Sequence, residues 1–521
     1  MKTLTLTLAA ALAVAAPLLT RAQEKSDVPK EEKPAEKKED GKPEEKKKDE
    51  KKEKEEKPKE SRGSVMIAGR EIKYLAKTGT MPLLKEDGSG ERANVFFVYY
   101  AATNGDGQPL AKTTAEKRPI TYCFNGGPGS AAVWLQFGGL GPKKVDLAPD
   151  GLTPATRAAV VPNPNSILDV TDLIFIDPVG TGASRPAKGE KAEQFWGVDE
   201  DVESVGEFIR LFTTREQRWA SPKYLCGESY GGIRASGLAK FLQDRHGLYL
   251  DGVISVSGVI NFEALWGGTL GLINFLPAYT ATAHYHKKLP ADLQANREKA
   301  IADSRAFAQT EYASALIKGK ALPADQRANV IAQLARFTGL DPDLIDRANL
   351  RIDSSLFFEN LLRKEGKIIG RFDGRVVAED ADRLDSGPEF DPSYTNVYGP
   401  FSAAANGSIR GDLGYEFDLP YRILGGVSWS YAKFGGRYVN MEDRLADAMK
   451  NNPRMRVLLC LAWRDLAVPP DSALYSLGQL RIPDSLRANI RVEYYESGHM
   501  MYLYQPDADK LRRDLVNFIG Q

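Results

Sequence analysis

The sequence predicts an α/β fold, in which a mostly parallel central sheet is covered by helices and carries one helical insertion. Short apolar strands alternate with helical patterns over residues 63–260. Helical patterns then dominate residues 261–425, and the alternation returns over residues 426–521. Because alternating strands and helices form parallel sheets, we expect the first and last of these regions to build one core and the middle one to form a helical cap.

The strands of the predicted core are short apolar runs bounded by turn residues. Residues 65–75 and 93–102 form the first two, before the regular alternation begins. These are followed by ITYCF, DLIFI, KYLCG and GVISVSGVI, and the second part of the core contains RVLLCLAW and IRVEYY. Short apolar runs of this kind are typical of strands that are buried on both faces.

Helical periodicity separates these strands and fills the insertion. In the core, the predicted helices span residues 199–212, 233–244, 470–480 and 507–519. In the insertion, they span residues 290–316 and 323–337, with loops rich in Asp, Gly and Pro. The sequence shows no internal repeat of the kind that solenoids have.

Residues 1–22 have the pattern of a cleavable export signal. Lys2 precedes an apolar stretch over residues 4–19, and Thr20-Arg21-Ala22 places small residues where a signal peptidase reads them. The stretch is shorter than the about 20 apolar residues that a membrane span needs. No later segment is apolar enough to cross a bilayer. We therefore expect an exported protein, secreted or periplasmic after cleavage, with no integral membrane segment.

Residues 23–62 form a run of Lys and Glu interrupted by prolines. Because such a run has almost nothing to bury, we expect a disordered linker. Over the whole chain, Lys+Arg and Asp+Glu both number 70, so the formal net charge is zero. This balance gives no reason to expect a nucleic-acid partner.

The three cysteines, Cys123, Cys226 and Cys460, each lie within an apolar strand run. An odd number without close pairs is a poor basis for a disulfide framework. Their spacing is not that of zinc ligands either. We expect buried thiols, and neither a metal nor another cofactor.

One serine has the surroundings of an enzyme nucleophile. Ser229 lies in GESYG, residues 227–231, which is the only GxSxG motif of the chain and stands between a strand and a helix. Glycines two positions on either side of the serine permit a tight turn that exposes its hydroxyl. The motif and its context predict Ser229 as a nucleophile.

A serine nucleophile needs a base and a carboxylate that orients the base. The chain has 4 histidines, of which His499 lies in the loop after the last predicted strand, and Asp465 follows the strand RVLLCLAW. Taken singly, His499 could be an ordinary loop histidine and Asp465 a helix N-cap. The order Ser, Asp, His, each after a strand, is that of the α/β-hydrolases. We therefore expect an α/β-hydrolase fold with Ser229, Asp465 and His499 as a catalytic triad.

A glycine-rich turn offers donors for an oxyanion. The sequence NGGPG, residues 125–129, directly follows the strand ITYCF. Glycine lets backbone N–H groups approach a ligand closely, so we expect the N–H groups of Gly127 and Tyr230 to form an oxyanion hole. The alternative interpretation is a plain Gly-Pro turn.

These motifs resemble those of the serine carboxypeptidases, and especially those of their bacterial members. The resemblance extends from about residue 95 to the C-terminus and rests on FNGGPGS, DPVGTGAS, GESYGG, LPAYTATAHYHKKL, WRDLAVPP and SGHM. It implies an α/β-hydrolase core with a helical cap over the site. It also implies hydrolysis of peptides from the C-terminus without a metal.

The resemblance further implies a binding site for the terminal carboxylate of the substrate. In that family an Asn, the Glu before the nucleophile and a Glu in an ELGP stretch bind this group. Asn125 and Glu228 match the first two, but the third position is Gly139, in the sequence GLGP. The cysteine that follows NGGPG in the family is here Ser130.

The sequence thus predicts an exported serine-type carboxypeptidase that acts on a peptide or another small acyl substrate through an acyl-enzyme. An esterase or acyltransferase with the same triad is the alternative, which Gly139 favours, because one fold hosts many chemistries. A non-catalytic binding protein is the third hypothesis, although a binder has no need of all three triad residues. The sequence leaves the oligomeric state open.

Overall fold

The computed structural model describes residues 57–154, 159–380 and 390–520. The predicted signal peptide, 1–22, and nearly all of the predicted linker, 23–62, lie outside these residues. The predicted end of the linker at residue 62 is wrong, because strand β1 (Lys59–Ile67) begins at Lys59 and pairs with the next strand along its whole length. Charged side chains are common on such edge strands, since half of them face solvent.

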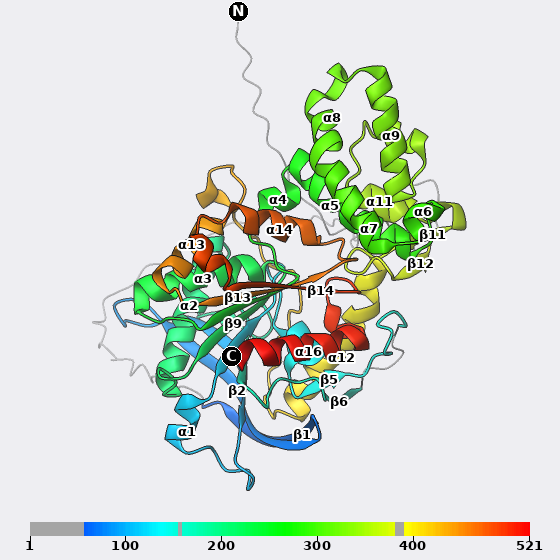
Figure 1. The fold of residues 1–521 in the computed structure, drawn as a ribbon. Coiled ribbons are helices and arrows are strands. Elements are labelled where there is room, and N and C mark those ends of the chain that lie inside the picture. Colours follow the sequence, from blue (N-terminus) through cyan, green and yellow to red (C-terminus); the bar gives the residue numbers. More distant parts are fainter. Residues whose placement is uncertain (1–56, 155–158, 381–389, 521) are drawn as a thin grey trace, which may run out of the picture. The chain divides into compact units, whose positions relative to one another are not determined.

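A 10-stranded sheet runs through the described residues, with strand order β1-β2-β3-β7-β4-β9-β10-β13-β14 and β8 paired with β3 (Figure 1). In this order, adjacent strands are antiparallel in the part β1-β2-β3-β7 and parallel in the part β7-β4-β9-β10-β13-β14. The other strands of this sheet are β2 (Arg70–Leu84), β3 (Glu91–Ala102), β4 (Ile120–Phe124), β7 (Asp172–Ile176), β8 (Arg185–Pro186), β9 (Lys223–Glu228), β10 (Gly252–Val256), β13 (Arg456–Ala462) and β14 (Ile490–Tyr495). The predicted mostly parallel central sheet is confirmed.

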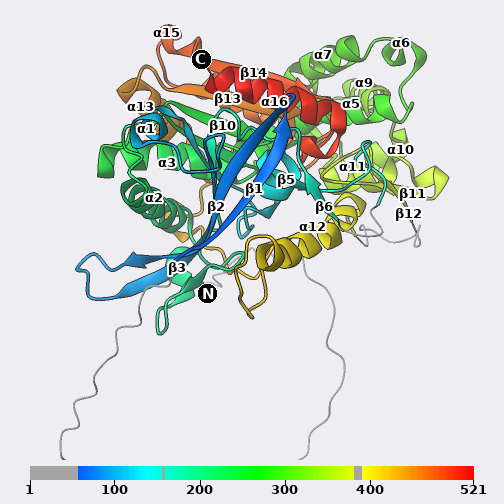
Figure 2. The ribbon, with the colours of Figure 1, turned by 90° about the horizontal axis from the view of Figure 1, so that it is seen from below.

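The first antiparallel strands form a hairpin that the sequence analysis missed. Residues 65–75, predicted as one strand, belong to both β1 and β2, which meet at a turn at Ala68 and Gly69. Both turn residues have positive φ, 47° and 77°. Tight hairpin turns need this left-handed backbone, which glycine adopts at no steric cost. Figure 2 shows the resulting long blue ribbon pair.

Helices cover both faces of the sheet. Alternate side chains of a strand point to opposite faces. On β3, Phe97 belongs to the buried cluster that includes side chains of α2 and α3, whereas Phe96 belongs to the cluster that includes side chains of α12 and α16. The helices outside the predicted insertion are α1 (Lys112–Lys117), α2 (Val198–Arg215), α3 (Gly231–His246), α13 (Glu442–Asn451), α14 (Pro470–Gln479), α15 (Asp484–Arg487) and α16 (Gln505–Ile519). Each predicted core helix is therefore present, with ends shifted by a few residues.

The predicted insertion begins with a group of helices that project from the sheet in Figure 1. The predicted helix 290–316 is broken, because the Asn296 side chain accepts a hydrogen bond from the Lys299 N–H and so starts a new helix. The helices of this group are α4 (Phe262–Trp266), α5 (Thr269–Tyr285), α6 (Ala291–Gln294), α7 (Arg297–Phe307), α8 (Ala313–Lys318), α9 (Ala324–Thr338), α10 (Pro342–Arg347) and α11 (Ser354–Asn360).

The later part of the predicted insertion returns to the core. A small hairpin, β11 (Lys367–Ile369) and β12 (Val377–Glu379), precedes α12 (Pro392–Gly411), whose Phe401 ring packs on Trp134 with ring centroids 4.8 Å apart. Another small sheet pairs β5 (Lys143–Val145) with β6 (Val160–Pro162). The boundaries 261 and 425 of a separate cap thus stay predictions, while α12 belongs to the packing of the central sheet.

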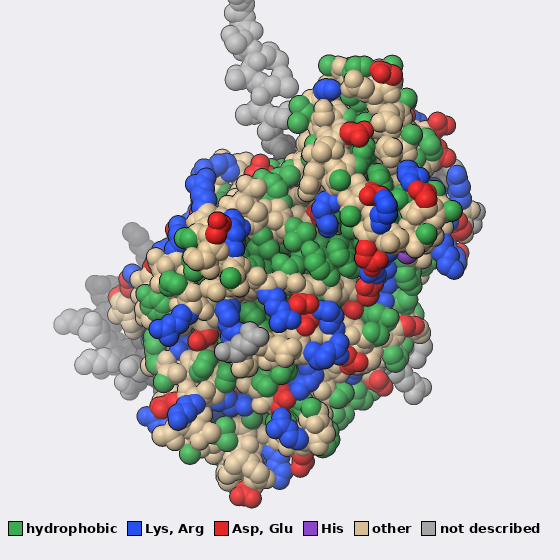
Figure 3. Space-filling view, in the orientation of Figure 1, with side chains coloured by type: hydrophobic (Ala, Val, Ile, Leu, Met, Phe, Trp, Pro, Cys, Tyr) green, Lys and Arg blue, Asp and Glu red, His purple; other side chains and the backbone are tan. Residues whose placement is uncertain are grey.

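Cys123, Cys226 and Cys460 are free and buried, as predicted, in β4, β9 and β13. On the face seen in Figure 3, basic and acidic side chains are interspersed, and a hydrophobic area lies where the projecting helices meet the core. None of the described helices is long and apolar enough to span a bilayer.

Candidate active site

The predicted site residues all lie at one edge of the sheet. Asn125 follows β4, Ser229 follows β9, Asp465 follows β13 and His499 follows β14. These strands are parallel, so their carboxyl ends meet at the same edge. In open α/β sheets, ligands bind at this edge.

Ser229 occupies a sharp turn between β9 and α3. Its φ is 61°, which is a strained value for a residue with a side chain. A Cβ atom on Gly227 would lie 2.2 Å from the Gly231 carbonyl oxygen, so glycine is needed there for the turn to close. The fold and this strand–turn–helix unit are those of the α/β-hydrolases, as the sequence predicts.

Asp465 and His499 form a buried pair. Nδ1 of His499 lies 2.7 Å from Oδ2 of Asp465, and the two residues are 3% and 0% exposed. Oδ1 of Asp465 accepts hydrogen bonds from the N–H groups of Ala467 and Val468, both at 2.8 Å. Burial acts to lower the pKa of His499, but the charge and hydrogen bond of Asp465 outweigh it and raise this pKa above its ordinary value. The imidazole is thus held in one orientation by a fixed carboxylate.

Ser229 and His499 do not share a hydrogen bond among the described residues. Glu228, which precedes Ser229 in the chain, has a pKa that is affected by the charges of both His499 and Asp465. Hydrogen bonds between a nucleophile and its base are often long without a substrate and tighten when one binds.

A segment after β11, which the sequence analysis missed, lies against the imidazole. The backbone oxygen of Phe372 accepts a hydrogen bond from the His499 N–H at 2.6 Å. The Phe372 ring also stacks on the His499 ring, with centroids 5.2 Å apart and planes 14° from parallel. The N–H of Leu466, next to Asp465, donates to the Arg371 backbone oxygen at 3.1 Å. Residues 371 and 372 therefore bond to both loops that carry the buried pair.

The glycine-rich turn after β4 approaches Ser229 closely. A Cβ atom on Gly126 would lie 2.4 Å from the Tyr230 backbone nitrogen and 2.9 Å from the Ser229 Cβ. Gly127 has a φ of 99°, which only glycine adopts freely. Among the described residues, neither the Gly127 N–H nor the Tyr230 N–H donates a hydrogen bond within the protein. Two backbone donors next to Ser229 thus have no acceptor in the described part of the chain.

Glu228 and Asn125 lie together beneath the nucleophile turn. Burial raises the pKa of Glu228 to about 7, against the opposing effects of the His499 charge and the Tyr502 hydrogen bond. Oδ1 of Asn125 accepts a hydrogen bond from the Leu135 N–H, whereas its buried Nδ2 has no partner among the described residues. The Tyr502 hydroxyl donates to Oε2 of Glu228 at 2.8 Å. Sequence reasoning missed Tyr502, although it lies close after His499.

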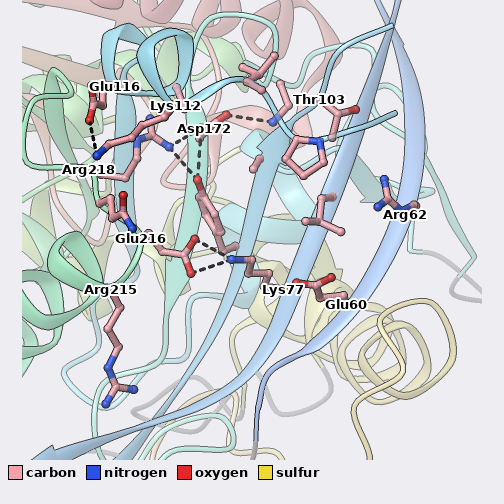
Figure 4. Close-up of a pocket in the computed structure, with 18 residues that line it drawn as sticks. Glu60, Arg62, Lys77, Thr103, Lys112, Glu116, Asp172, Arg215, Glu216 and Arg218 are labelled. Atoms are coloured by element: carbon pink, nitrogen blue, oxygen red, sulfur yellow. Dashed lines mark hydrogen bonds and ion pairs between the residues drawn. The ribbon is translucent and has the colours of Figure 1, made fainter. Parts of the chain in front are cut away.

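A separate pocket of about 440 Å³ opens at the other edge of the sheet, by the start of β7 (Figure 4). Several of its charged groups are paired with one another. Lys77 binds Glu216 at 2.7 Å, and Arg218 binds Asp172 at 2.6 Å. Because parallel sheets bind ligands at the carboxyl edge, this pocket is not the candidate active site.

Among the described residues, no group of three or more His, Cys, Asp or Glu side chains is arranged as metal ligands are. The groups that lie at the carboxyl edge are a hydroxyl group, an imidazole, carboxyl groups and backbone amides.

Comparisons with known proteins give one family match. Residues 85–326 match the family model described as serine carboxypeptidase, a stretch that includes Asn125, Ser229 and Tyr230 and ends before Asp465. No curated protein matches the chain.

Two of the solved structures that resemble the chain are peptidases by name. The first is Kex1, a prohormone-processing carboxypeptidase from Saccharomyces cerevisiae, 14% identical, with a TM-score of 0.49 over 86% of this chain and 91% of that one. The second is a proline iminopeptidase from Mycobacterium smegmatis, 14% identical, with a TM-score of 0.36 over 85% of this chain and 98% of that one. Over residues 85–326, just under half of its length, the chain is thus similar to the serine carboxypeptidase family of hydrolases.

Proposed function

We propose that the chain is an exported serine-type carboxypeptidase that cleaves the C-terminal peptide bond of its substrates through an acyl-enzyme. The observation that carries this proposal is the buried His499–Asp465 pair at the same sheet edge as Ser229, whose φ of 61° marks a nucleophile turn. A base oriented by a carboxylate is what a serine hydroxyl needs to become a nucleophile.

In the proposed mechanism, Ser229 Oγ attacks the acyl carbon of the scissile bond while Nε2 of His499 takes the hydroxyl proton. Asp465 keeps the proton of His499 on Nδ1 and stabilises the imidazolium that forms. His499 then gives its proton to the leaving amine. Water, activated by the same imidazole, hydrolyses the resulting ester and frees Ser229.

The developing oxyanion is proposed to bind the N–H groups of Gly127 and Tyr230. Both donors lack a protein acceptor among the described residues, and Gly126 packs directly against Tyr230. Donors that are already in place when charge develops cost no reorganisation, so they stabilise the transition state more than the substrate.

The terminal carboxylate of the substrate is proposed to bind Glu228 and Asn125. Two carboxylates would repel each other, so Glu228 must carry a proton and donate it in a hydrogen bond. Its burial, which raises its pKa to about 7, favours the protonated form in acidic and neutral solution. The unpaired Nδ2 of Asn125 supplies a further donor.

The pH dependence of kcat/KM tests this proposal. Below about pH 7 Glu228 is protonated and can bind a carboxylate, and above it the carboxylate form repels the substrate. Activity on free-acid peptides should therefore fall about tenfold per pH unit above pH 7, because one proton is lost. The acid limb should reflect His499, which must be neutral to act as a base, so the free-acid profile is bell-shaped.

Matched C-terminally amidated peptides are the control, because they have no terminal carboxylate. Their kcat/KM should rise through the pKa of His499 to a plateau and show no alkaline fall. The Glu228→Gln variant should lose the alkaline fall on free-acid peptides as well. Superimposable profiles on the two kinds of peptide, unaffected by Glu228→Gln, would exclude carboxylate recognition by Glu228.

An esterase or acyltransferase with the same triad is the second candidate. Gly139 favours it, since the resemblance places a carboxylate-binding Glu at this position. Under this candidate, aryl or alkyl esters would be turned over with a high kcat/KM while peptides of either kind would not. A panel of esters and peptides assayed with the same enzyme sample separates the two candidates.

Export is proposed from residues 1–22 alone. Cleavage after Ala22 would produce a mature chain that begins at Gln23. N-terminal sequencing of the protein from the periplasmic and extracellular fractions tests both the cleavage and the final location. A chain that keeps Met1 in the cytoplasm would contradict the proposal.

A further inference from the structure

Tyr502 fills a space between two glycines and the proposed carboxylate site. A Cβ atom on Gly138 would lie 2.4 Å from Cε2 of the Tyr502 ring, and one on Gly139 would lie 3.0 Å from its Cγ. At the other end of the ring, the hydroxyl donates to Oε2 of Glu228 at 2.8 Å. The ring therefore lies across two residues without side chains and directs its hydroxyl at Glu228.

The groups around this hydroxyl form an incomplete hydrogen-bond network. Tyr502, Glu228 and Asn125 are 4%, 3% and 2% exposed. Nδ2 of Asn125 has no partner among the described residues, and a buried donor without a partner is costly. Because Oε2 of Glu228 accepts from Tyr502, the other carboxyl oxygen is left to carry the proton. An anionic ligand with two oxygens would complete the network.

Tyr502 keeps its proton whatever the state of Glu228. Burial, and then the charge of Glu228, raise the pKa of Tyr502 well above its ordinary value. The hydroxyl is thus a hydrogen-bond donor throughout the pH range in which proteins work. Its hydrogen bond also lowers the pKa of Glu228 from the value that burial alone would give.

We propose that Tyr502 is a specificity-determining residue for substrates with a free terminal carboxylate, because its neutral hydroxyl fixes Glu228 in the orientation that presents a proton to that group. This inference rests on the proposed carboxypeptidase function. In this arrangement Glu228 gains or loses a proton near neutral pH, whereas Tyr502 stays protonated. Recognition of the carboxylate is therefore lost in a single proton step.

The Tyr502→Phe variant tests the inference, since it removes the hydroxyl and keeps the ring in its space. The kcat/KM for free-acid peptides should fall roughly tenfold, as the loss of one hydrogen bond predicts, while that for amidated peptides stays unchanged. The alkaline fall on free-acid peptides should move to higher pH, because Glu228 loses the donor that favours its ionised form. The Tyr504→Phe variant, two residues away, should change neither quantity.

Each other outcome has a distinct meaning. Equal losses on both kinds of peptide, with the alkaline fall unmoved, would show a merely structural role and overturn the inference alone. Unchanged selectivity in a variant that melts like the wild type would overturn it too. If the wild type itself does not distinguish free-acid from amidated peptides, the proposed function fails and this inference fails with it.

Discussion

Replacing His499 by Ala should lower kcat by about 10³ to 10⁶, and Ser229→Ala should do the same. Without the imidazole, the Ser229 hydroxyl keeps its proton and is a weak nucleophile. The two residues act as a unit, so the double variant should be no slower than either single one. Asp465→Ala should be similarly severe, because it leaves the buried His499 without the carboxylate that lies 2.7 Å from its Nδ1.

Steady-state assays measure the loss of turnover, and covalent labelling by a fluorophosphonate measures the reactivity of Ser229. Only an activated serine reacts readily with such a probe, so wild type should be labelled and Ser229→Ala should not. His284→Ala is the matched control, since His284 lies in α5 and its Nε2 is bonded to the Gln294 backbone oxygen. Loss of activity in His284→Ala but not in His499→Ala would make the assignment of the base wrong.

Gly126→Ala should lower kcat by about 10² to 10³ with a smaller change in KM. The added methyl carbon would lie 2.4 Å from the Tyr230 backbone nitrogen and 2.7 Å from the Glu228 backbone oxygen. Neither atom belongs to a flexible side chain, so the turn after β4 and the nucleophile turn must move apart. That movement displaces the proposed oxyanion donors from the position where charge develops.

Gly407→Ala is the control for this variant. Gly407 lies in α12 with open space around its Cα, so alanine should leave turnover unchanged and favour the helix slightly. Thermal melts of both variants separate a loss of catalysis from a loss of folding. Full turnover in a folded Gly126→Ala protein would remove this turn from the proposed oxyanion hole.

Most of the sheet could be predicted from the sequence because its strands are continuous apolar runs, such as ITYCF in β4. The errors lie where short-range patterns are ambiguous. One glycine, Gly69, marks the hairpin turn of β1 and β2, and apolar residues on both sides make the two strands look like one. The break before α7 depends on the side chain of Asn296, which a helical pattern also tolerates.

The candidate site could be predicted as far as motifs and strand ends indicate it. Tyr502 and Phe372 could not, because their roles depend on where a side chain points and on contacts between distant parts of the chain. The pair Gly138-Gly139 was the available signal for Tyr502, since two adjacent glycines leave room for a large ring. For Phe372, the sequence offers no such signal.

The bonds between residues 371–372 and the loops of Asp465 and His499 also affect the stage of folding at which the proposed active site forms. The His499 N–H reaches back to Phe372, so the bond closes a very long loop of chain. Contacts of this kind are slow to form, because the entropy of loop closure must be overcome first. The imidazole is thus oriented only after the chain between residues 372 and 499, which includes α12, β13 and β14, has come together. With His499 as the proposed base, a nascent or extended chain carries Ser229 without an oriented base, and we expect hydrolysis only by the finished molecule.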